Sequence, residues 1–360
     1  MKKVLIIINT GFVSYGGLTT VMMNYYRAMD KTNLQIDFAS TNVVEENLHK
    51  KLLDNGSKYF CLGDRKKILK YQINLFKVLK AGNYEVVHIN GNSATMVVEL
   101  LPSKICRVKK RIVHNHTAKC NHQRLHRILY PIFKRLYTDA IACSKKAGEW
   151  IYRDGNFIVF NNGIDTEKYR FCLKQRKKIR DQYGIEDDCT LIGHVGKIYE
   201  PKNHPFLINI FRKITQLDTS AKLILVGDGE MRKQIESQVK ELDIADKVIF
   251  AGMQNNIPAY LSAIDIFMFP SIWEGMPLSV IEAQASGLPC LISESIDKDV
   301  CISNSILRLP IDSSDVWVDA FIKTNIADRR FQSNENIQKI VEKNYDSRSV
   351  ANKLKALYLE

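Results

Sequence analysis

With 360 residues, 45% of them hydrophobic and 25% charged, the chain has an ordinary globular composition and is long enough for two cores of about 150–200 residues. No apolar run approaches the ~18 residues of a membrane-spanning helix, and the start MKKVLIIIN lacks the length and cleavage site of a signal peptide, so we interpret it as a buried strand. Eight scattered cysteines without a C-x-x-C pair disfavour zinc and disulfide frameworks and indicate reduced thiols in a cytoplasm.

The formal net charge of +13 is distributed unevenly along the chain. Residues 1–165 hold 26 Lys and Arg against 12 Asp and Glu, whereas the remainder holds 26 against 27. This asymmetry predicts a polyanionic partner for the first half: an anionic lipid surface, a phosphorylated acceptor or a nucleic acid. Charge that only keeps solvated helices soluble is the alternative.

Short apolar runs alternate with helical patterns along the chain, which is typical of parallel sheets covered on both faces. We predict strands at 4–9, 35–40, 85–90, 111–116, 139–144 and 157–163, and again at 190–196, 222–227, 247–252, 264–270 and 288–293. The polar, charged stretch 166–188 breaks this rhythm, and the last stretch is predicted to be helical.

These patterns predict an α/β protein with two doubly wound, Rossmann-like domains that face each other across a cleft. Residues 1–165 form the first domain, 166–188 a linker and 189–340 the second domain, and a C-terminal helix at about 340–360 packs back on the first domain. Ligands of such sheets bind at the carboxyl ends of the strands.

The run SIWEGMPLSVIEAQASGLP (271–289) predicts a loop followed by a helix that begins near Pro277 and stops at Gly287. The free N–H groups of the helix N-terminus can bind an anion, and Gly275 allows close backbone approach. Glu274 in the loop and Glu282 in the helix can accept hydrogen bonds from sugar hydroxyls at either end of a diphosphate. For Glu282, a salt bridge on the helix surface is the alternative.

Two lysines, Lys197 and Lys202, lie in GHVGKIYEPKNH (193–204), directly after a predicted strand; ordinary solvated lysines are one interpretation, and the family resemblance described below implies the other, that they neutralise a leaving diphosphate without a metal. Gly16 and Gly17 precede a predicted helix and form either a phosphate-binding turn or a plain tight turn.

Three histidines follow or lie within predicted strands. His114 and His116 share one strand face at its carboxyl end, so either can contact a ligand, while a metal-binding pair lacks an evident third ligand. His88 is predicted to be a satisfied core histidine.

Together these segments resemble the retaining family-4 glycosyltransferases of GT-B fold, in particular the capsule and exopolysaccharide branch. The resemblance rests on the E-x7-E run, GHVGKIYEPKNH, LILVGDGE (223–230), NNGID (161–165) and YGG (15–17). It implies His116, Glu274, Lys197 and Lys202 as catalytic residues. It implies a donor-binding set of Gly16, Gly17, Asn203, Gly227, Gly275, Met276, Pro277, Leu278 and Glu282. Lys197 departs from the arginine of the family, so its grip on the pyrophosphate is expected to be looser or shared with Asn203.

The resemblance implies transfer of a hexose or N-acetylhexosamine from a nucleotide diphosphate sugar, UDP being favoured, to a saccharide or lipid-pyrophosphate-linked acceptor. We expect retention of configuration, no cofactor and no metal, since we identify no Asp-x-Asp metal site. Amphipathic, basic segments at 65–80 and 122–137 suit the inner face of the cell membrane, and packing of their apolar stripes on the sheet is the alternative. A GT-B epimerase or hydrolase is the alternative enzyme, and a basic nucleic-acid-binding protein is the alternative of another class.

Overall fold

The computed structural model describes residues 1–13, 16–117, 119–120, 122–153, 155–274, 276–326 and 328–360. The chain divides into two compact units. Unit 1 comprises Met1–Gly163 and Asn344–Glu360, and unit 2 comprises Ile164–Lys343. Within the described ranges, no helix combines the length and the apolar character that crossing a membrane requires.

Unit 1 is built on a seven-stranded parallel sheet in the order β3-β2-β1-β4-β5-β6-β7. Its strands are β1 (Lys2–Ile8), β2 (Leu34–Ser40), β3 (Tyr59–Cys61), β4 (Val86–Gly91), β5 (Lys110–Asn115), β6 (Asp139–Ala142) and β7 (Ile158–Val159). Its helices are α1 (Gly17–Ala28), α2 (Glu46–Leu53), α3 (Ile68–Gly82), η1 (Ala94–Met96), α4 (Val97–Ile105), α5 (Gln123–Phe133), α6 (Lys145–Tyr152) and α14 (Ser347–Leu359).

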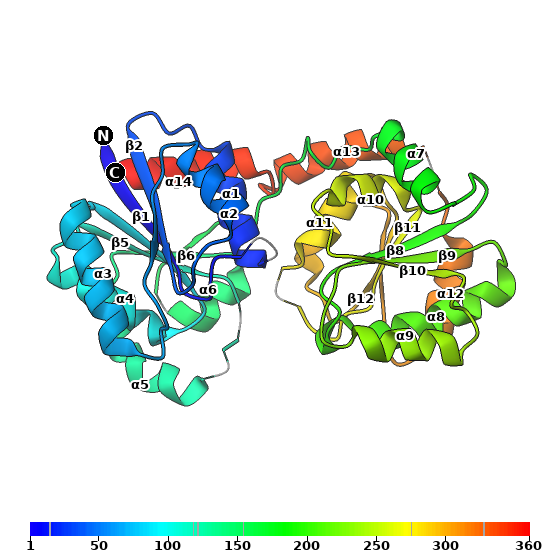
Figure 1. Cartoon of the computed structure of the whole chain (residues 1–360), viewed down its shortest axis with the longest axis horizontal. Coiled ribbons are helices and arrows are strands. Elements are labelled where there is room, and N and C mark those ends of the chain that lie inside the picture. The colour runs from blue at the N-terminus through cyan, green and yellow to red at the C-terminus, as the bar shows by residue number, and fades with distance from the viewer. Residues whose placement is uncertain (14–15, 118, 121, 154, 275, 327) are drawn as a thin grey trace. The chain divides into compact units, whose positions relative to one another are not determined.

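Side-chain alternation divides the unit 1 sheet into two buried faces. Leu5 and Ile7 of β1 pack in one core with apolar residues of α3 to α6, whereas their neighbour Ile6 is buried on the opposite face. Helices α1 and α14 contact each other, and α14 contacts β1 (Figure 1). The sheet is therefore covered on both sides, as a doubly wound fold requires.

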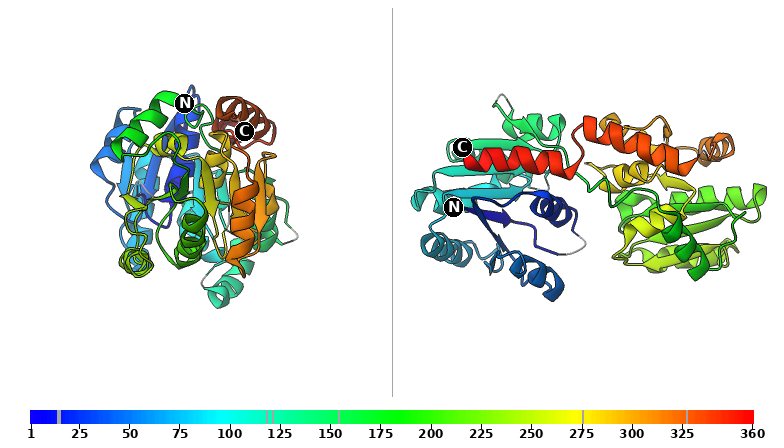
Figure 2. Two further views of the ribbon diagram at one scale, coloured as in Figure 1. Left: turned by 90° about the vertical axis from the view of Figure 1, so that its right-hand side faces the viewer. Right: turned by 90° about the horizontal axis from the view of Figure 1, so that it is seen from above.

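The last helix, α14, completes unit 1 although 180 residues of unit 2 precede it in the chain. Lys2 Nζ donates to the carbonyl oxygen of Leu359 at 2.8 Å, and Lys110 Nζ donates to that of Leu357 at 2.6 Å. Figure 2 shows α14, in red, running along the unit 1 sheet. The two chain termini consequently belong to the same unit.

Unit 2 has a six-stranded parallel sheet in the order β10-β9-β8-β11-β12-β13. Its strands are β8 (Leu191–Val195), β9 (Lys222–Val226), β10 (Val248–Gly252), β11 (Ile266–Phe269), β12 (Cys290–Ser293) and β13 (Ile306–Leu309). Its helices are α7 (Leu173–Gln182), η2 (Glu200–Lys202), α8 (His204–Leu217), α9 (Arg232–Glu241), α10 (Ile257–Ala263), α11 (Leu278–Ala285), η3 (Lys298–Val300), α12 (Ser314–Lys323) and α13 (Arg329–Glu342).

Helices α8, α9 and α12 share one core with the unit 2 sheet, and the contacting helices α7, α10, α11 and α13 form the other layer. The predicted α/β class with two Rossmann-like domains is confirmed. The pattern did not reveal β3 and β13, which are short edge strands of three and four residues.

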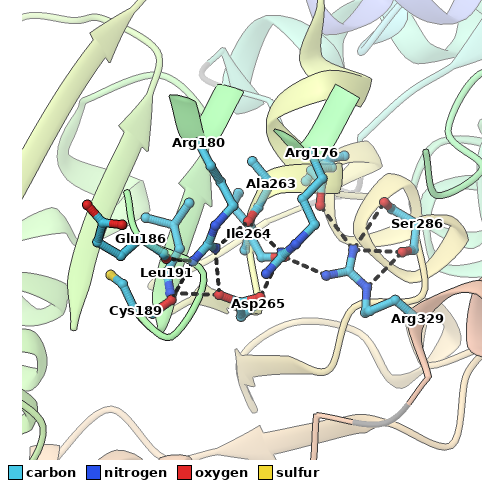
Figure 3. A network of polar contacts seen from close by, with 11 residues as sticks. Arg176, Arg180, Glu186, Cys189, Leu191, Ala263, Ile264, Asp265, Ser286 and Arg329 are labelled. Carbon is cyan, nitrogen blue, oxygen red and sulfur yellow. Dashed lines mark hydrogen bonds and ion pairs between the residues drawn. The ribbon is translucent and has the colours of Figure 1, made fainter. Parts of the chain in front are cut away.

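Residues 166–188 differ from the linker that we expected. They belong to unit 2 and carry α7, which is tied to the rest of the unit by a buried cluster around Asp265 (Figure 3). Arg176 and Arg180 of α7 place their Nη1 atoms 2.8 Å and 3.0 Å from the two carboxylate oxygens of Asp265. Arg176 and Arg180, two of the charged residues that suggested a solvated linker, thus anchor α7 to the rest of unit 2.

A third arginine extends this cluster to α13. Arg329 donates to the carbonyl oxygens of Ser286 and Leu261, and burial lowers its pKa to about 9. Asp265 also accepts a hydrogen bond from the backbone N–H of Leu191 at 2.8 Å, which joins the starts of β8 and β11. The cluster thus braces the amino-terminal edge of the sheet.

Candidate active site

The strand order of unit 2 contains one reversal, between β8 and β11. The chain builds β8, β9 and β10 outward in one direction and then returns to place β11 on the other side of β8. Loops that follow two such strands separate at their carboxyl ends and leave a crevice in which ligands of doubly wound sheets bind. The loops 196–203 and 270–277 both start there. A hydrogen bond from the N–H of Ile272 to the carbonyl oxygen of Pro201 (2.8 Å) ties them together.

The reversal brings together two of the sequence-predicted residues, Lys202 and Glu274. Lys202 Nζ lies 2.7 Å from Glu274 Oε1, and the two side chains are only 11% and 13% exposed. The ammonium group also lies 4.2 Å from the ring centroid of Phe269. Burial lowers the pKa of Lys202, and the neighbouring Glu274 partly offsets this. Lys202 is therefore a cation with little competing water, available to a phosphate that displaces the carboxylate.

Two histidines that were not predicted as site residues lie close to Lys202. His194 of β8 is fully buried and hydrogen-bonds through Nδ1 to the carbonyl oxygen of Met268 at 2.9 Å. The ring of His204, at the start of α8, contacts the ring of His194 edge-on at a centroid distance of 4.6 Å. Burial, with Lys202 as a second cause, lowers the pKa of His204 to about 4, so the ring is neutral near pH 7. The place of His194 at the end of a predicted strand, in GHVG, could have indicated that it lies near the site. No pattern in the sequence indicated this for His204.

Gly227 sits where β9 meets the loop after β8. Its φ is +142°, and a Cβ there would lie 2.0 Å from the carbonyl oxygen of Gly196. Gly229, which was not predicted, has a similar constraint, since its Cβ would lie 2.2 Å from the carbonyl oxygen of Ile198. These glycines let the loop after β9 approach the loop after β8 backbone to backbone, at the carboxyl end of the sheet.

Helix α11 follows the loop after β11. Its N-cap residue is Pro277, whose carbonyl oxygen accepts from the Val280 N–H at 3.2 Å, and no described side chain caps the first turn, so this helix N-terminus can receive an anion. Met276 and Leu278 are half-buried beside Pro277, which is buried. Gly275 lies outside the described residues.

Glu282 lies in the second turn of α11 and is only 6% exposed. Burial raises its pKa to about 7, and a hydrogen bond from Tyr169 and the charge of Lys168 act in the opposite direction. The alternative of a surface salt bridge is wrong for this buried residue. Tyr169 was missed because it lies in the segment that was expected to link the domains.

The remaining predicted residues of unit 2 have other partners. Lys197 is exposed, and its Nζ lies 2.8 Å from Glu230 Oε2. Its partner is therefore not Glu274, which pairs with Lys202. Asn203 has a left-handed backbone (φ +56°) between η2 and α8 and is half-buried. Lys202 and Lys197 thus occupy unlike environments, the first enclosed and the second hydrated.

In unit 1 the strand order reverses between β1 and β4, and the predicted residues again lie near that edge. Gly16 is the N-cap of α1, and Gly17 is exposed with no atom within 4 Å of an added Cβ. His116 directly follows β5 and is half-buried, with Nε2 3.0 Å from the Oδ1 atom of Asn90. Burial lowers its pKa to about 3, so its ring is neutral at physiological pH.

The other two histidines of this edge are fully buried. The His114 ring contacts the His116 ring at a centroid distance of 4.1 Å and an interplanar angle of 34°, and its Nδ1 lies 3.3 Å from Nε2 of His88. His88 is a satisfied core histidine, as expected, because its Nδ1 pairs with the Tyr358 hydroxyl at 2.6 Å. Of the two candidates His114 and His116, His116 is the one with solvent-accessible surface.

A metal site finds no support in the described part of the chain. It contains no group of three or more His, Cys, Asp or Glu side chains that could hold an ion. The sequence does contain one Asp-x-Asp tripeptide, Asp297–Asp299, that our reading overlooked. There the Asp297 carboxylate accepts a hydrogen bond from the Asp299 N–H at 3.1 Å and caps η3.

Comparisons with known proteins identify the class of enzymes that this chain is similar to. Residues 175–297 match the family model of the glycosyl transferases group 1. The chain is 29% identical over 333 residues to EpsF of Bacillus subtilis, named as a glycosyltransferase, covering 87% of this chain and 86% of that protein. It is 25% identical over 316 residues to an Escherichia coli protein named UDP-Gal:alpha-D-GlcNAc-diphosphoundecaprenol alpha-1,3-galactosyltransferase, covering 82% and 80%. The Anabaena protein HepE, solved with UDP and glucose, has the same fold, with a TM-score of 0.79, 19% identity and complete coverage of both chains.

Proposed function

We propose that this chain, whose residues 175–297 match the family model of the glycosyl transferases group 1, is a family-4-type GT-B glycosyltransferase that moves a hexose or N-acetylhexosamine from a UDP-sugar onto a saccharide or lipid-pyrophosphate-linked acceptor. The product belongs to a cell-surface polysaccharide of the capsule or exopolysaccharide kind. The relatives named for UDP-galactose transfer to a diphosphoundecaprenol-linked sugar and for UDP binding support this choice.

The observation that carries the proposal is the buried Lys202–Glu274 pair at the strand-order reversal of unit 2. In the proposed donor complex, Lys202 pairs with the diphosphate and thereby releases Glu274 to accept hydrogen bonds from the transferred sugar. The N-terminus of α11, with the segment from Gly275 to Leu278, binds the diphosphate. The Glu282 carboxylate accepts hydrogen bonds from the ribose hydroxyls. Lys197, Asn203 and Gly227 complete the donor site.

We assign the residues of unit 1 to the transferred sugar. His116 is neutral, so its role is to orient a hydroxyl rather than to act as a general base. Gly17 leaves room for the sugar and the reacting carbon beside α1, and Gly16 forms the tight turn that caps this helix, where an added Cβ would lie 3.1 Å from Val13 Cγ2.

The proposed reaction retains the configuration of the sugar and needs neither a protein nucleophile nor a metal. The acceptor hydroxyl oxygen bonds to the anomeric carbon as the bond from that carbon to the diphosphate oxygen breaks on the same face. The hydroxyl proton passes to the departing diphosphate, whose charge Lys202 and Lys197 stabilise.

A product assay tests this function. The purified chain is screened by thermal shift against a panel of nucleotide sugars and then incubated with the stabilising donor and a lipid-pyrophosphate-linked saccharide. We expect a new glycosidic bond whose anomeric configuration, read by NMR, equals that of the donor, with EDTA leaving the rate unchanged. Glu274→Gln abolishes transfer, whereas Glu241→Gln, on the surface of α9, does not.

Three outcomes would contradict the proposal. Donor turnover without an acceptor indicates an epimerase or hydrolase, and a strict need for added Mn²⁺ rules out the metal-free reaction. Salt-sensitive binding to nucleic acid without transfer points to the non-enzymatic alternative.

An anionic membrane surface is the second proposed partner, at the cytoplasmic side of the cell membrane. Helix α5 supports it, because only part of its amphipathic pattern is used for packing. Phe133 is buried, whereas Leu125, Ile128 and Ile132 are 45%, 71% and 48% exposed. Their spacing of three and four residues places them in one stripe.

The exposed stripe of α5 has basic neighbours: Arg124, Arg127, Lys134 and Arg135 are all exposed. Leu69 and Ile73 of α3, in the other predicted segment, are exposed as well. An apolar stripe flanked by cations is the composition of helices that lie in the interface of anionic bilayers.

Vesicle sedimentation tests this partner. We expect binding to phosphatidylglycerol vesicles that weakens with salt and is lost in the triple variant Leu125→Ser, Ile128→Ser, Ile132→Ser. The control variant Leu217→Ser, Ile322→Ser removes two equally exposed apolar side chains from unit 2 and retains binding. Equal binding to neutral phosphatidylcholine vesicles would contradict the proposal.

A further inference from the structure

Four buried or half-buried side chains form a continuous row across one face of the unit 1 sheet. The row starts at the Tyr358 hydroxyl on α14, passes through His88 of β4 and His114 of β5, and ends at His116. The three successive contacts are hydrogen-bonding separations of 2.6 Å and 3.3 Å and a tilted ring contact with 4.1 Å between centroids. A phenylalanine at position 358 would fill the same buried space, so packing alone does not require the hydroxyl.

The direction of these hydrogen bonds follows from the chemistry of the groups. A neutral imidazole has one N–H donor and one bare nitrogen. Tyr358 has one proton, and among the described residues its hydroxyl has no partner other than His88 Nδ1. The phenol therefore donates to Nδ1, His88 carries its proton on Nε2 and donates it to Nδ1 of His114, and His114 is left with its proton on Nε2. One hydroxyl thus sets the tautomers of two buried rings.

His116 is tied into the row from two sides. The amide oxygen of Asn90 only accepts, so His116 donates to it from Nε2 and keeps a bare Nδ1. Its Nδ1 atom is buried, and burial lowers the pKa of His116 while the side chain of Asn162 acts in the opposite direction. The ring face rests on His114, whose plane depends on its bond to His88.

We propose that Tyr358 is a positioning residue for sugar transfer: through His88 and His114 its hydroxyl holds the His116 ring in one orientation at the carboxyl end of β5. The proposal rests on the role assigned to His116 above. It gives the C-terminal helix, which returns to unit 1 after the whole of unit 2, a part in the reaction as well as in the fold.

The test compares Tyr358→Phe with Tyr152→Phe in the full chain. Tyr152 is the matched control, because it is equally buried in unit 1 and its hydroxyl hydrogen-bonds to the carbonyl oxygens of Val113 and Ile141 instead of a histidine. Long-range ¹H–¹⁵N spectra of histidine-labelled protein report the tautomers directly. We expect single Nε2–H tautomers for His88 and His114 in the native protein and in Tyr152→Phe, and mixed tautomers in Tyr358→Phe.

The kinetic readout uses the donor and acceptor of the transfer assay. Tyr358→Phe is expected to lower kcat about tenfold, the scale of a mispositioned group, with the donor KM unchanged, while Tyr152→Phe retains kcat. The combination Tyr358→Phe, His116→Ala should lose no more activity than His116→Ala alone.

Unchanged tautomers in Tyr358→Phe, or an equal loss of kcat in Tyr152→Phe, overturn the proposal. The spectra need no substrate, so they separate its failure from that of the proposed function. A chain that transfers no sugar yet shows the tautomer change contradicts the function and leaves the positioning of the ring established.

Discussion

The burial of Glu282 is expected to make donor binding depend on pH. Its pKa is raised to about 7, so it is roughly one-tenth ionised at pH 6 and nine-tenths ionised at pH 8. Only the carboxylate accepts hydrogen bonds from both ribose hydroxyls, so binding favours the ionised form. The Kd of a UDP-sugar should fall about tenfold from pH 6 to pH 8, measured by calorimetry.

The variant Glu282→Gln removes the titrating group and should flatten this profile at the weaker affinity. The donor itself does not interfere, since its diphosphate is esterified at both ends and does not titrate in this range. A profile that is already flat in the native protein would contradict the assignment of Glu282 to the ribose.

Lys202 differs from the other lysines in the exclusion of water around it. Lys202→Ala should weaken binding of the UDP-sugar by on the order of 1.5–3 kcal/mol, because a charge-assisted hydrogen bond to phosphate is lost. Calorimetry measures the change. The control is Lys213→Ala, which breaks a lysine–carboxylate pair of 2.6 Å on the surface and should leave donor affinity unchanged. Native affinity in Lys202→Ala would remove this lysine from the donor site.

At the scale of elements, the cluster of Asp265 with Arg176, Arg180 and Arg329 decides whether α7 and α13 are held on the sheet. Asp265→Asn leaves the buried guanidinium groups without their carboxylate. We expect a loss of about 3–5 kcal/mol in the free energy of unfolding, the usual cost of breaking a buried ion pair, from urea denaturation.

A surface pair provides the comparison for this cluster. Asp315→Asn removes the partner of Lys213, whose side chain is 41% exposed, and should cost less than about 1 kcal/mol. If both variants lose the same stability, the arginine cluster is not what holds α7.

At the scale of the whole molecule, the two units depend on the C-terminal segment unequally. Helix α14 buries Val350, Leu354 and Leu357 in unit 1, whereas unit 2 ends at Lys343. Deleting 344–360 should therefore raise amide hydrogen exchange throughout the unit 1 sheet and leave unit 2 protected. Equal exchange in unit 1 before and after the deletion would show that α14 is dispensable for its stability.

Much of this fold follows from local patterns. The buried strands β1, β4, β8 and β9 are short apolar runs bounded by turn residues, and glycine and proline marked both ends of α11. The edge strands β3 and β13 were missed; both are short, and most of their residues are not buried. Helix α7 was missed because its burial depends on Asp265, which lies 85 residues from Arg180.

The sequence by itself determined the α/β alternation, the two Rossmann-like units and the motifs that place Lys202, Glu274 and Glu282 at the end of a sheet. Those features depend on the spacing of neighbouring residues. Only the tertiary structure decided that Lys202 is enclosed while Lys197 is hydrated, that Glu282 titrates near neutrality, and that Tyr358 reaches the histidine row. Burial and hydrogen bonding between distant segments set these properties, because the water that surrounds a side chain is removed by residues far from it in the chain.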